Sequence, residues 1–121
     1  MESEIPRREL RADTRSLIEQ VVSVLEDKKA EDIVALEVGA VSSLADVFIV
    51  ASGTSERHLQ TLQDAVQQEL KVSGQQAFGS EGQGTGWCLI DYGDVVVHLF
   101  DHETRGYYDL ERLWVQPDVS G

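Results

Sequence analysis

Two stretches of the chain have apolar residues at the spacing of amphipathic helices. They run from about Thr14 to Lys29 and from about Ser55 to Lys71, with apolar residues every three or four positions. Such a stripe packs one side of a helix on a core and leaves the other side in water. The stripes consist of Leu17, Val21, Val24 and Leu25 in the first helix and of Leu59, Leu62, Val66 and Leu70 in the second.

Shorter apolar segments predict β-strands. Residues 32–38, DIVALEV, are rich in branched side chains, and residues 46–52, DVFIVAS, are apolar at successive positions, which is typical of a central strand buried on both faces. Residues 87–100, WCLIDYGDVVVHLF, contain two strands around the hairpin turn signal Gly93-Asp94. The spacing in residues 103–114, ETRGYYDLERLW, is compatible with a last, short helix.

The order of these elements predicts an α/β (α+β) fold, a small mixed β-sheet with the two long helices packed on it. A chain of 121 residues has the length of one domain with one core. We expect a mobile N-terminal arm over residues 1–13, where the sequence is polar and charged, and a single domain over residues 14–115. Residues 116–121 are expected to form a short polar tail.

The turn at Gly93-Asp94 fixes the pairing of the two hairpin strands. Tyr92 is expected opposite Val95, and the remaining pairs follow out to Trp87 opposite Phe100. Because side chains alternate between the sides of a strand, the hairpin has two distinct faces. One face is almost wholly apolar and belongs to the core: Cys88, Ile90, Tyr92, Val95, Val97 and Leu99. The opposite face carries Trp87, Leu89, Asp91, Val96, His98 and Phe100.

This second hairpin face fits neither a solvated surface nor a pure core. Large apolar residues lie beside Asp91 and His98, and these two polar groups would need buried partners inside a core. Aromatic side chains mixed with a few polar groups are typical of the centre of a protein–protein interface. Two interpretations remain open: the face binds a partner, or the last helical segment folds over it and buries it.

The charge of the chain restricts the class of partner. With 22 acidic and 10 basic residues, the formal charge is −12 at pH 7. Such a field repels the phosphates of nucleic acids, so DNA is not an expected ligand, whereas a basic protein is attracted. A protein of this charge that works near RNA is expected to bind a basic protein there.

Location follows from the apolar runs and the cysteine content. No apolar run approaches the ~20 residues of a membrane-spanning helix, and the first residues resemble neither a secretory signal nor an organelle transit peptide. Cys88 is the only cysteine, so no internal disulfide can form. We expect a cytoplasmic protein that does not bind membranes, with Cys88 as a small buried hydrophobic residue rather than a nucleophile.

Residues that could bind a metal or perform catalysis do not form a convincing pattern. His98, Asp101 and His102 are expected to be polar surface groups rather than a metal site, because the first lies in a predicted strand and the second begins a turn. Ser52, Ser55 and His58 are close in sequence, but adjacency does not make a catalytic triad. The glycine-rich segment GSEGQGTG, residues 79–86, lacks the lysine of a P-loop and is predicted to be a flexible loop.

The segment SGTSERHL, residues 52–59, has the outline of a phosphate-binding loop. Gly53 permits a tight turn, and Thr54 or Ser55 is a suitable N-cap for the following helix. The free amides of a helix start attract anions, but Glu56 beside them disfavours a phosphate. We therefore favour a turn and a cap over a nucleotide site.

Two stretches resemble the ribosomal silencing factor family, also called Iojap or YbeB. They are SSLADVFIVASGTSERHLQ, residues 42–60, and WCLIDYGDVVVHLFDHETRGYYDLERLW, residues 87–114. The similarity extends over nearly all of residues 17–114. It implies a small α/β fold related to nucleotidyltransferases but without their activity.

The resemblance also implies a function and a site. Family members bind the large ribosomal subunit through universal ribosomal protein fourteen, block joining of the small subunit and lower translation when nutrients are scarce. A bacterial protein acting in this way without a cofactor is expected. The contact residues that the resemblance suggests are Trp87, Leu89, Asp91, His98 and Phe100. Tyr107 and Tyr108 are expected to extend or brace that surface, and packing of Tyr108 on the sheet is an equal alternative.

The relationship to nucleotidyltransferases permits a check of the residues. These enzymes need two carboxylates alternating on one strand to hold magnesium. Here Asp46 is present, but Phe48 occupies the second position, so the clamp cannot form. A nucleotide-binding enzyme is the alternative function, and a homodimer formed through the aromatic face when the protein is free is a further possibility.

Overall fold

The computed structural model describes residues 12–39, 45–82 and 84–108, and the side chains of residues 12, 107 and 108 are outside this description. Residues 1–11 of the predicted arm and all of the predicted tail, 116–121, therefore lie outside it. None of the helices in the described ranges has the length and apolarity that crossing a bilayer requires.

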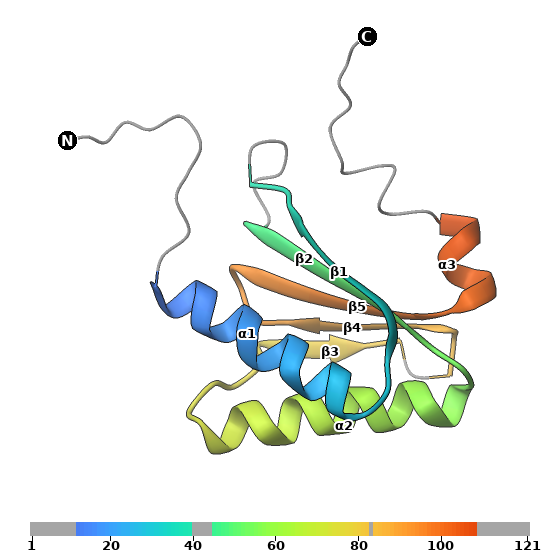
Figure 1. The fold of residues 1–121 in the computed structure, drawn as a ribbon, viewed down its shortest axis with the longest axis horizontal. Coiled ribbons are helices and arrows are strands. Elements are labelled where there is room, and N and C mark those ends of the chain that lie inside the picture. Colours follow the sequence, from blue (N-terminus) through green and yellow to red (C-terminus); the bar gives the residue numbers. More distant parts are fainter. Residues whose placement is uncertain (1–11, 40–44, 83, 109–121) are drawn as a thin grey trace, which may run out of the picture.

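A five-stranded mixed sheet forms the centre of the molecule (Figure 1). The strands lie in the order β1-β2-β5-β4-β3, and only the neighbouring pair β2 and β5 is parallel. Their bounds are β1 Glu31–Glu37, β2 Val47–Gly53, β3 Gly79–Glu81, β4 Trp87–Asp91 and β5 Val95–Asp101. The prediction of a small mixed sheet is confirmed.

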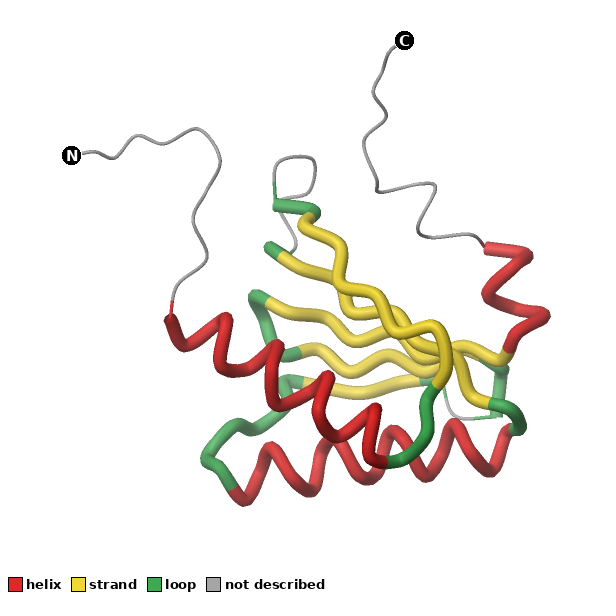
Figure 2. Tube along the Cα trace, in the orientation of Figure 1, coloured by secondary structure: helices red, strands yellow, loops and turns green. Residues whose placement is uncertain are grey.

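Two long helices cover one face of this sheet (Figures 1 and 2). α1 spans Ala12–Asp27, so it begins two residues earlier than predicted, and α2 spans Glu56–Val72. Their apolar stripes and the inward residues of β2, β4 and β5 form one core, which includes Leu25, Leu62 and Leu99, all fully buried. We call this side of the sheet the covered face.

Local signals in the sequence account for the ends of α2. Ser55 is the N-cap, and its hydroxyl accepts a hydrogen bond of 3.0 Å from the His58 backbone N–H. At the other end Gly74 adopts a positive φ of 94°, and the amide of Gln75 donates to the carbonyl of Leu70. This is the Schellman arrangement, which satisfies the last carbonyls of a helix.

The hairpin forms in the predicted register. Trp87 pairs with Phe100 and Asp91 with Val96, and the amide of Tyr92 donates to the carbonyl of Val95. β2 pairs on both sides and all seven of its residues are buried, which confirms its central position.

The prediction of a flexible loop over residues 79–86 is wrong at its start. Gly79–Glu81 forms β3, which pairs with β4 in antiparallel orientation at the edge of the sheet. All three residues are exposed, so the strand buries no side chains and leaves no apolar pattern in the sequence.

The last described element is α3, His102–Tyr108, which continues directly from β5. Its presence confirms the helical part of the predicted last segment as far as Tyr108. Residues 109–114 of that prediction lie outside the described part of the chain.

Candidate functional site: the sheet face opposite the two helices

The sheet face that points away from α1 and α2 carries a second apolar cluster. We call it the distal face. Val38, Ala45, Phe48, Val50 and Phe100 are its buried members. Val34, Leu36, Trp87 and Val96 are partly buried around them. The cluster arises because β2 and β5 alternate apolar residues on both of their sides.

Aromatic rings meet at the centre of this face. Trp87 stacks on Phe100, with ring centroids 5.0 Å apart and an interplanar angle of 27°. The edge of one ring meets the other between Phe48 and His98, whose centroids are 4.6 Å apart at 63°. Such offset and edge-on geometries are the favourable ones for aromatic pairs. Trp87 is half-buried, whereas Phe100 and His98 are buried.

His98 is held in one tautomer by Trp87. The indole Nε1–H of Trp87 donates to Nδ1 of His98 at 3.1 Å, so the neutral imidazole carries its proton on Nε2. His98 is only 4% exposed, and Nε2 has no hydrogen-bond partner within the described ranges. Burial disfavours the charged ring and lowers the pKa of His98 from 6.5 to about 4. The neutral ring therefore acts as a hydrogen-bond acceptor toward Trp87 over the ordinary pH range.

Leu89 and Asp91 continue the distal face along β4 toward the turn. Leu89 lies opposite His98 in the register and is half-buried. The Asp91 carboxylate accepts a 2.8 Å hydrogen bond from the backbone N–H of Gly93, whose φ of 87° is the left-handed conformation that the tight turn needs. Asp91 therefore also stabilises the turn of the hairpin.

α3 is fixed to the end of the sheet beside the distal face. Asp101 accepts a 2.7 Å hydrogen bond from the amide of Thr104 and so caps the helix, while its own amide donates to the carbonyl of Gly86. Arg105 donates from Nη1 to the hydroxyl of fully buried Ser52 at 2.7 Å. These contacts join α3 to β2 and β5.

The structure brings together some of the predicted site residues. Trp87, His98 and Phe100 are in ring contact, and Leu89 is adjacent by register. Tyr107 and Tyr108 are the last two residues of α3, but their side chains are outside the description. Whether the last segment, residues 103–114, folds over the hairpin face stays open, because residues 109–114 lie outside the described ranges.

Two features of this face were missed by sequence reasoning. Phe48 was noted only as a replacement for a carboxylate, although the strict alternation of β2 would have placed it beside Val50 on one side of the strand. The hydrogen bond between Arg105 and Ser52 joins residues 53 positions apart, and no local pattern indicates such a pair.

The expectation that His98 is a polar surface group is wrong. It lies in a central strand whose distal side is apolar, and Trp87 satisfies its Nδ1. Asp101 and His102, the other two residues considered as metal ligands, have separate partners. His102 contacts Glu31 at 2.8 Å, and Asp101 caps α3. Within the described ranges, no three metal-binding side chains of His, Cys, Asp or Glu come together.

The loop that resembles a phosphate site has the geometry of a cap. Besides the Ser55 cap, Nδ1 of His58 accepts the amide of Thr54 at 2.9 Å, and its Nε2 lies 2.9 Å from the carbonyl of Lys28. In these bonds, polar groups of the loop are paired with other groups of the protein, and the end of α1 is joined to the start of α2.

Cys88 lies in the core of the covered face, as expected. Desolvation, with the carboxylates of Glu56 and Asp64 as further causes, raises the pKa of its thiol from 9.0 to about 11. The reactive thiolate is therefore disfavoured at neutral pH.

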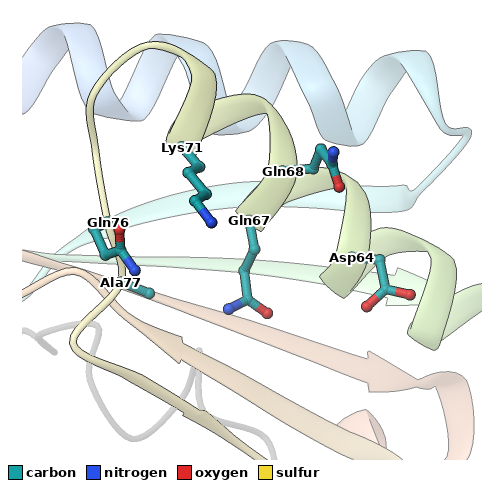
Figure 3. Close-up of a pocket in the computed structure, with 6 residues that line it drawn as sticks. All are labelled: Asp64, Gln67, Gln68, Lys71, Gln76 and Ala77. Atoms are coloured by element: carbon teal, nitrogen blue, oxygen red, sulfur yellow. The ribbon is translucent and has the colours of Figure 1, made fainter.

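A separate hollow of about 390 Å³ lies on the helix side of the molecule, between α2 and the segment that leads into β3 (Figure 3). Its lining consists of Asp64, Gln67, Gln68, Lys71, Gln76 and Ala77. None of the predicted site residues lines it, and it offers amides and one pair of opposite charges instead of the aromatic surface of the distal face.

Comparison with known proteins gives consistent matches. The family described as "Ribosomal silencing factor during starvation" (RsfS) matches residues 11–120. The chain is 45% identical over 94 residues to "Ribosomal silencing factor RsfS" of Chromobacterium violaceum, covering 77% of each chain. It is 37% identical to the protein of that name from Bacillus subtilis, covering 83% of this chain and 86% of the relative. A crystal structure of a Chromobacterium violaceum protein is similar with a TM-score of 0.80 at 39% identity, covering 88% of this chain and 92% of that one.

Proposed function

Because the chain belongs to the ribosomal silencing factor family (RsfS), we propose that it represses translation by binding the large ribosomal subunit. The bound protein blocks joining of the small subunit by steric occlusion and performs no chemical reaction. It acts in the bacterial cytoplasm when nutrients are limiting. Its direct partner is universal ribosomal protein fourteen.

The observation that carries this proposal is the aromatic cluster of the distal face. Trp87 is half-buried at the surface of a cluster that also contains Phe48 and Phe100. Leu89, also half-buried, lies opposite His98 in the strand register. A patch with a large aromatic residue at its centre and a few polar groups beside it has the composition of a binding hot spot. The two long helices lie on the other side of the sheet, so neither of them covers the distal face (Figure 2).

The residues of the proposed contact have different roles. Trp87, Leu89 and Asp91 are half-buried and supply direct contacts, while His98 and Phe100 are buried, contact the Trp87 indole and support it. Tyr107 and Tyr108, the last two residues of α3, are included in the proposal as residues that extend or brace this surface. The complete set is Trp87, Leu89, Asp91, His98, Phe100, Tyr107 and Tyr108.

The charge of the protein supports a protein partner rather than bare RNA. A formal charge of −12 repels the phosphate backbone, whereas a basic ribosomal protein is attracted and its encounter is accelerated. This attraction predicts that the association rate falls as salt is added.

Sedimentation tests the proposal directly. Purified protein is expected to comigrate with large subunits and to reduce their joining to small subunits, and a protein that does neither contradicts the proposal. Trp87→Ala is expected to weaken binding by about 2 kcal/mol or more, because a central aromatic anchor is lost. Val72→Ala is the control, since Val72 is 81% exposed on α2, away from the distal face, and its removal is expected to leave binding unchanged.

Two rival uses of the chain are tested separately. A nucleotidyltransferase-like enzyme is expected to bind a nucleoside triphosphate with magnesium, so a calorimetric titration without heat contradicts it. The buried position of Phe48 supports the non-enzymatic proposal, and so do the hydrogen bonds by which the Ser55 loop caps α2.

We further propose that the free protein pairs with a second copy through the distal face, in which case Trp87→Ala lowers the mass measured in solution.

A further inference from the structure

The polar atom of the Trp87 indole points into the protein. Its Nε1–H donates to Nδ1 of His98, which is 4% exposed, at 3.1 Å. The same indole stacks on Phe100, so this hydrogen bond and the stacking together restrict both its position and its rotation. A partner therefore meets the carbon atoms of the indole instead of its donor.

We infer that His98 is a positioning residue for docking: its Nδ1 holds the Trp87 ring in the orientation that the partner recognises. This inference rests on the proposed function, and it adds the chemistry that a partner must present. Because the indole donor is already satisfied, the matching group is an aliphatic side chain or a cation placed over the ring face, and not a hydrogen-bond acceptor. The acidic field of the chain favours the cation.

Packing alone does not account for a histidine at this position. The ring lies between Phe48 and Phe100, with centroids 4.6 Å and 6.3 Å away, and a phenyl group would make the same contacts. Histidine instead brings a buried Nε2–H that has no partner within the described ranges, and such a group destabilises a fold. What the imidazole provides and a phenyl does not is the acceptor for Trp87.

Two substitutions separate the hydrogen bond from the ring. His98→Phe keeps the aromatic contacts and removes the acceptor, whereas His98→Asn shortens the side chain but places an amide oxygen near the Nδ1 position. Each variant is measured for thermal stability, for affinity toward large subunits, and for the ¹⁵N–¹H resonance of the Trp87 indole, which Trp87→Phe identifies.

We expect His98→Phe to be at least as stable as the wild type. Its indole resonance moves upfield with faster exchange, and its affinity falls about fivefold, the contribution of one ordinary hydrogen bond. His98→Asn is less stable but keeps the indole resonance and an affinity within about twofold of the wild type. If His98 only stabilised the fold, the more stable variant, His98→Phe, would bind more tightly than His98→Asn. If His98→Phe does not fold, His98→Leu replaces it with the same expected loss.

The outcomes separate the two proposals. Wild-type protein that does not bind large subunits overturns the proposed function and this inference with it. Wild-type binding together with unchanged affinity of a folded His98→Phe overturns the positioning role alone. An indole resonance that is the same in His98→Phe and the wild type also overturns it, because the hydrogen bond is then not the constraint.

Discussion

The two faces of one sheet differ in how their side chains are specified. On the covered face, strands and helices bury apolar groups such as Ile49, Val97 and Leu99, and packing is the main requirement. On the distal face, built by the alternate residues of the same strands, rings meet at defined angles and His98 accepts a directed hydrogen bond. The first face needs only dense packing, whereas the second also fixes the orientation of its rings. The comparison shows that apolar patterning identifies a core but not the orientation of the groups beside it.

The largest predicted difference between the two faces is in their contribution to stability. Leu99→Ala removes a fully buried side chain from the covered face and is expected to lower the free energy of unfolding by about 3 kcal/mol, because a cavity remains. Leu89→Ala, on the distal face and half-buried, is the matched control and is expected to cost about 1 kcal/mol while weakening binding to the large subunit. Urea unfolding measures the first quantity and sedimentation the second. Equal stability losses in the two variants would contradict the division of roles.

The second prediction concerns the pH dependence of stability, to which His98 on the distal face contributes. The pKa of His98 is about 4 in the folded protein and 6.5 ordinarily, so between these values the unfolded chain binds an additional proton. The free energy of unfolding therefore decreases as pH falls from about 6.5 to about 4, by on the order of 3 kcal/mol, and this contribution is constant below pH 4. Carboxylates titrate in the same range, so the measured quantity is the difference between wild type and His98→Phe. Parallel stability curves for the two proteins would show that His98 does not cause the decrease.

The smallest effect concerns the hydroxyl of Tyr92 on the covered face. Tyr92 is buried there, its hydroxyl has no hydrogen-bond partner within the described ranges, and burial raises its pKa from 10.0 to about 12. Tyr92→Phe is expected to change stability at pH 7 by less than about 1 kcal/mol. In the wild type, the folded chain retains the phenol proton between pH 10 and about 12 after the unfolded chain has lost it, so stability falls as pH rises.

Denaturation across this alkaline range tests the variant. Tyr92→Phe is expected to remove the phenol part of the decrease and to keep the part due to Cys88, whose pKa is about 11. A variant whose alkaline stability curve matches that of the wild type would exclude a contribution from Tyr92.

Local signals made most of the fold predictable. Gly93-Asp94 fixed the hairpin register, because a two-residue turn leaves one pairing that keeps Cys88 and Leu99 on the same side. Ser55 was identifiable as a cap because its hydroxyl acts within one turn of helix. β3 was not predictable, since an exposed edge strand such as Gly79–Glu81 has no apolar alternation to detect.

The sequence indicated which residues share the candidate site, but not how they are arranged or how deeply they are buried. Alternation placed Trp87, His98 and Phe100 on one face, but it could not show that His98 is buried, because burial depends on packing between strands distant in sequence. The same limit applies to the contact between Ser52 and Arg105, which tertiary structure alone creates.

Asp101 has a consequence for the thermodynamics of docking. It is the last residue of β5 and also the N-cap of α3, so no loop residue separates the strand from the helix. A partner that spans the distal face and α3 therefore meets one rigid body and does not have to order a flexible connection. The entropy lost on association is correspondingly small, and more of the contact energy remains as affinity.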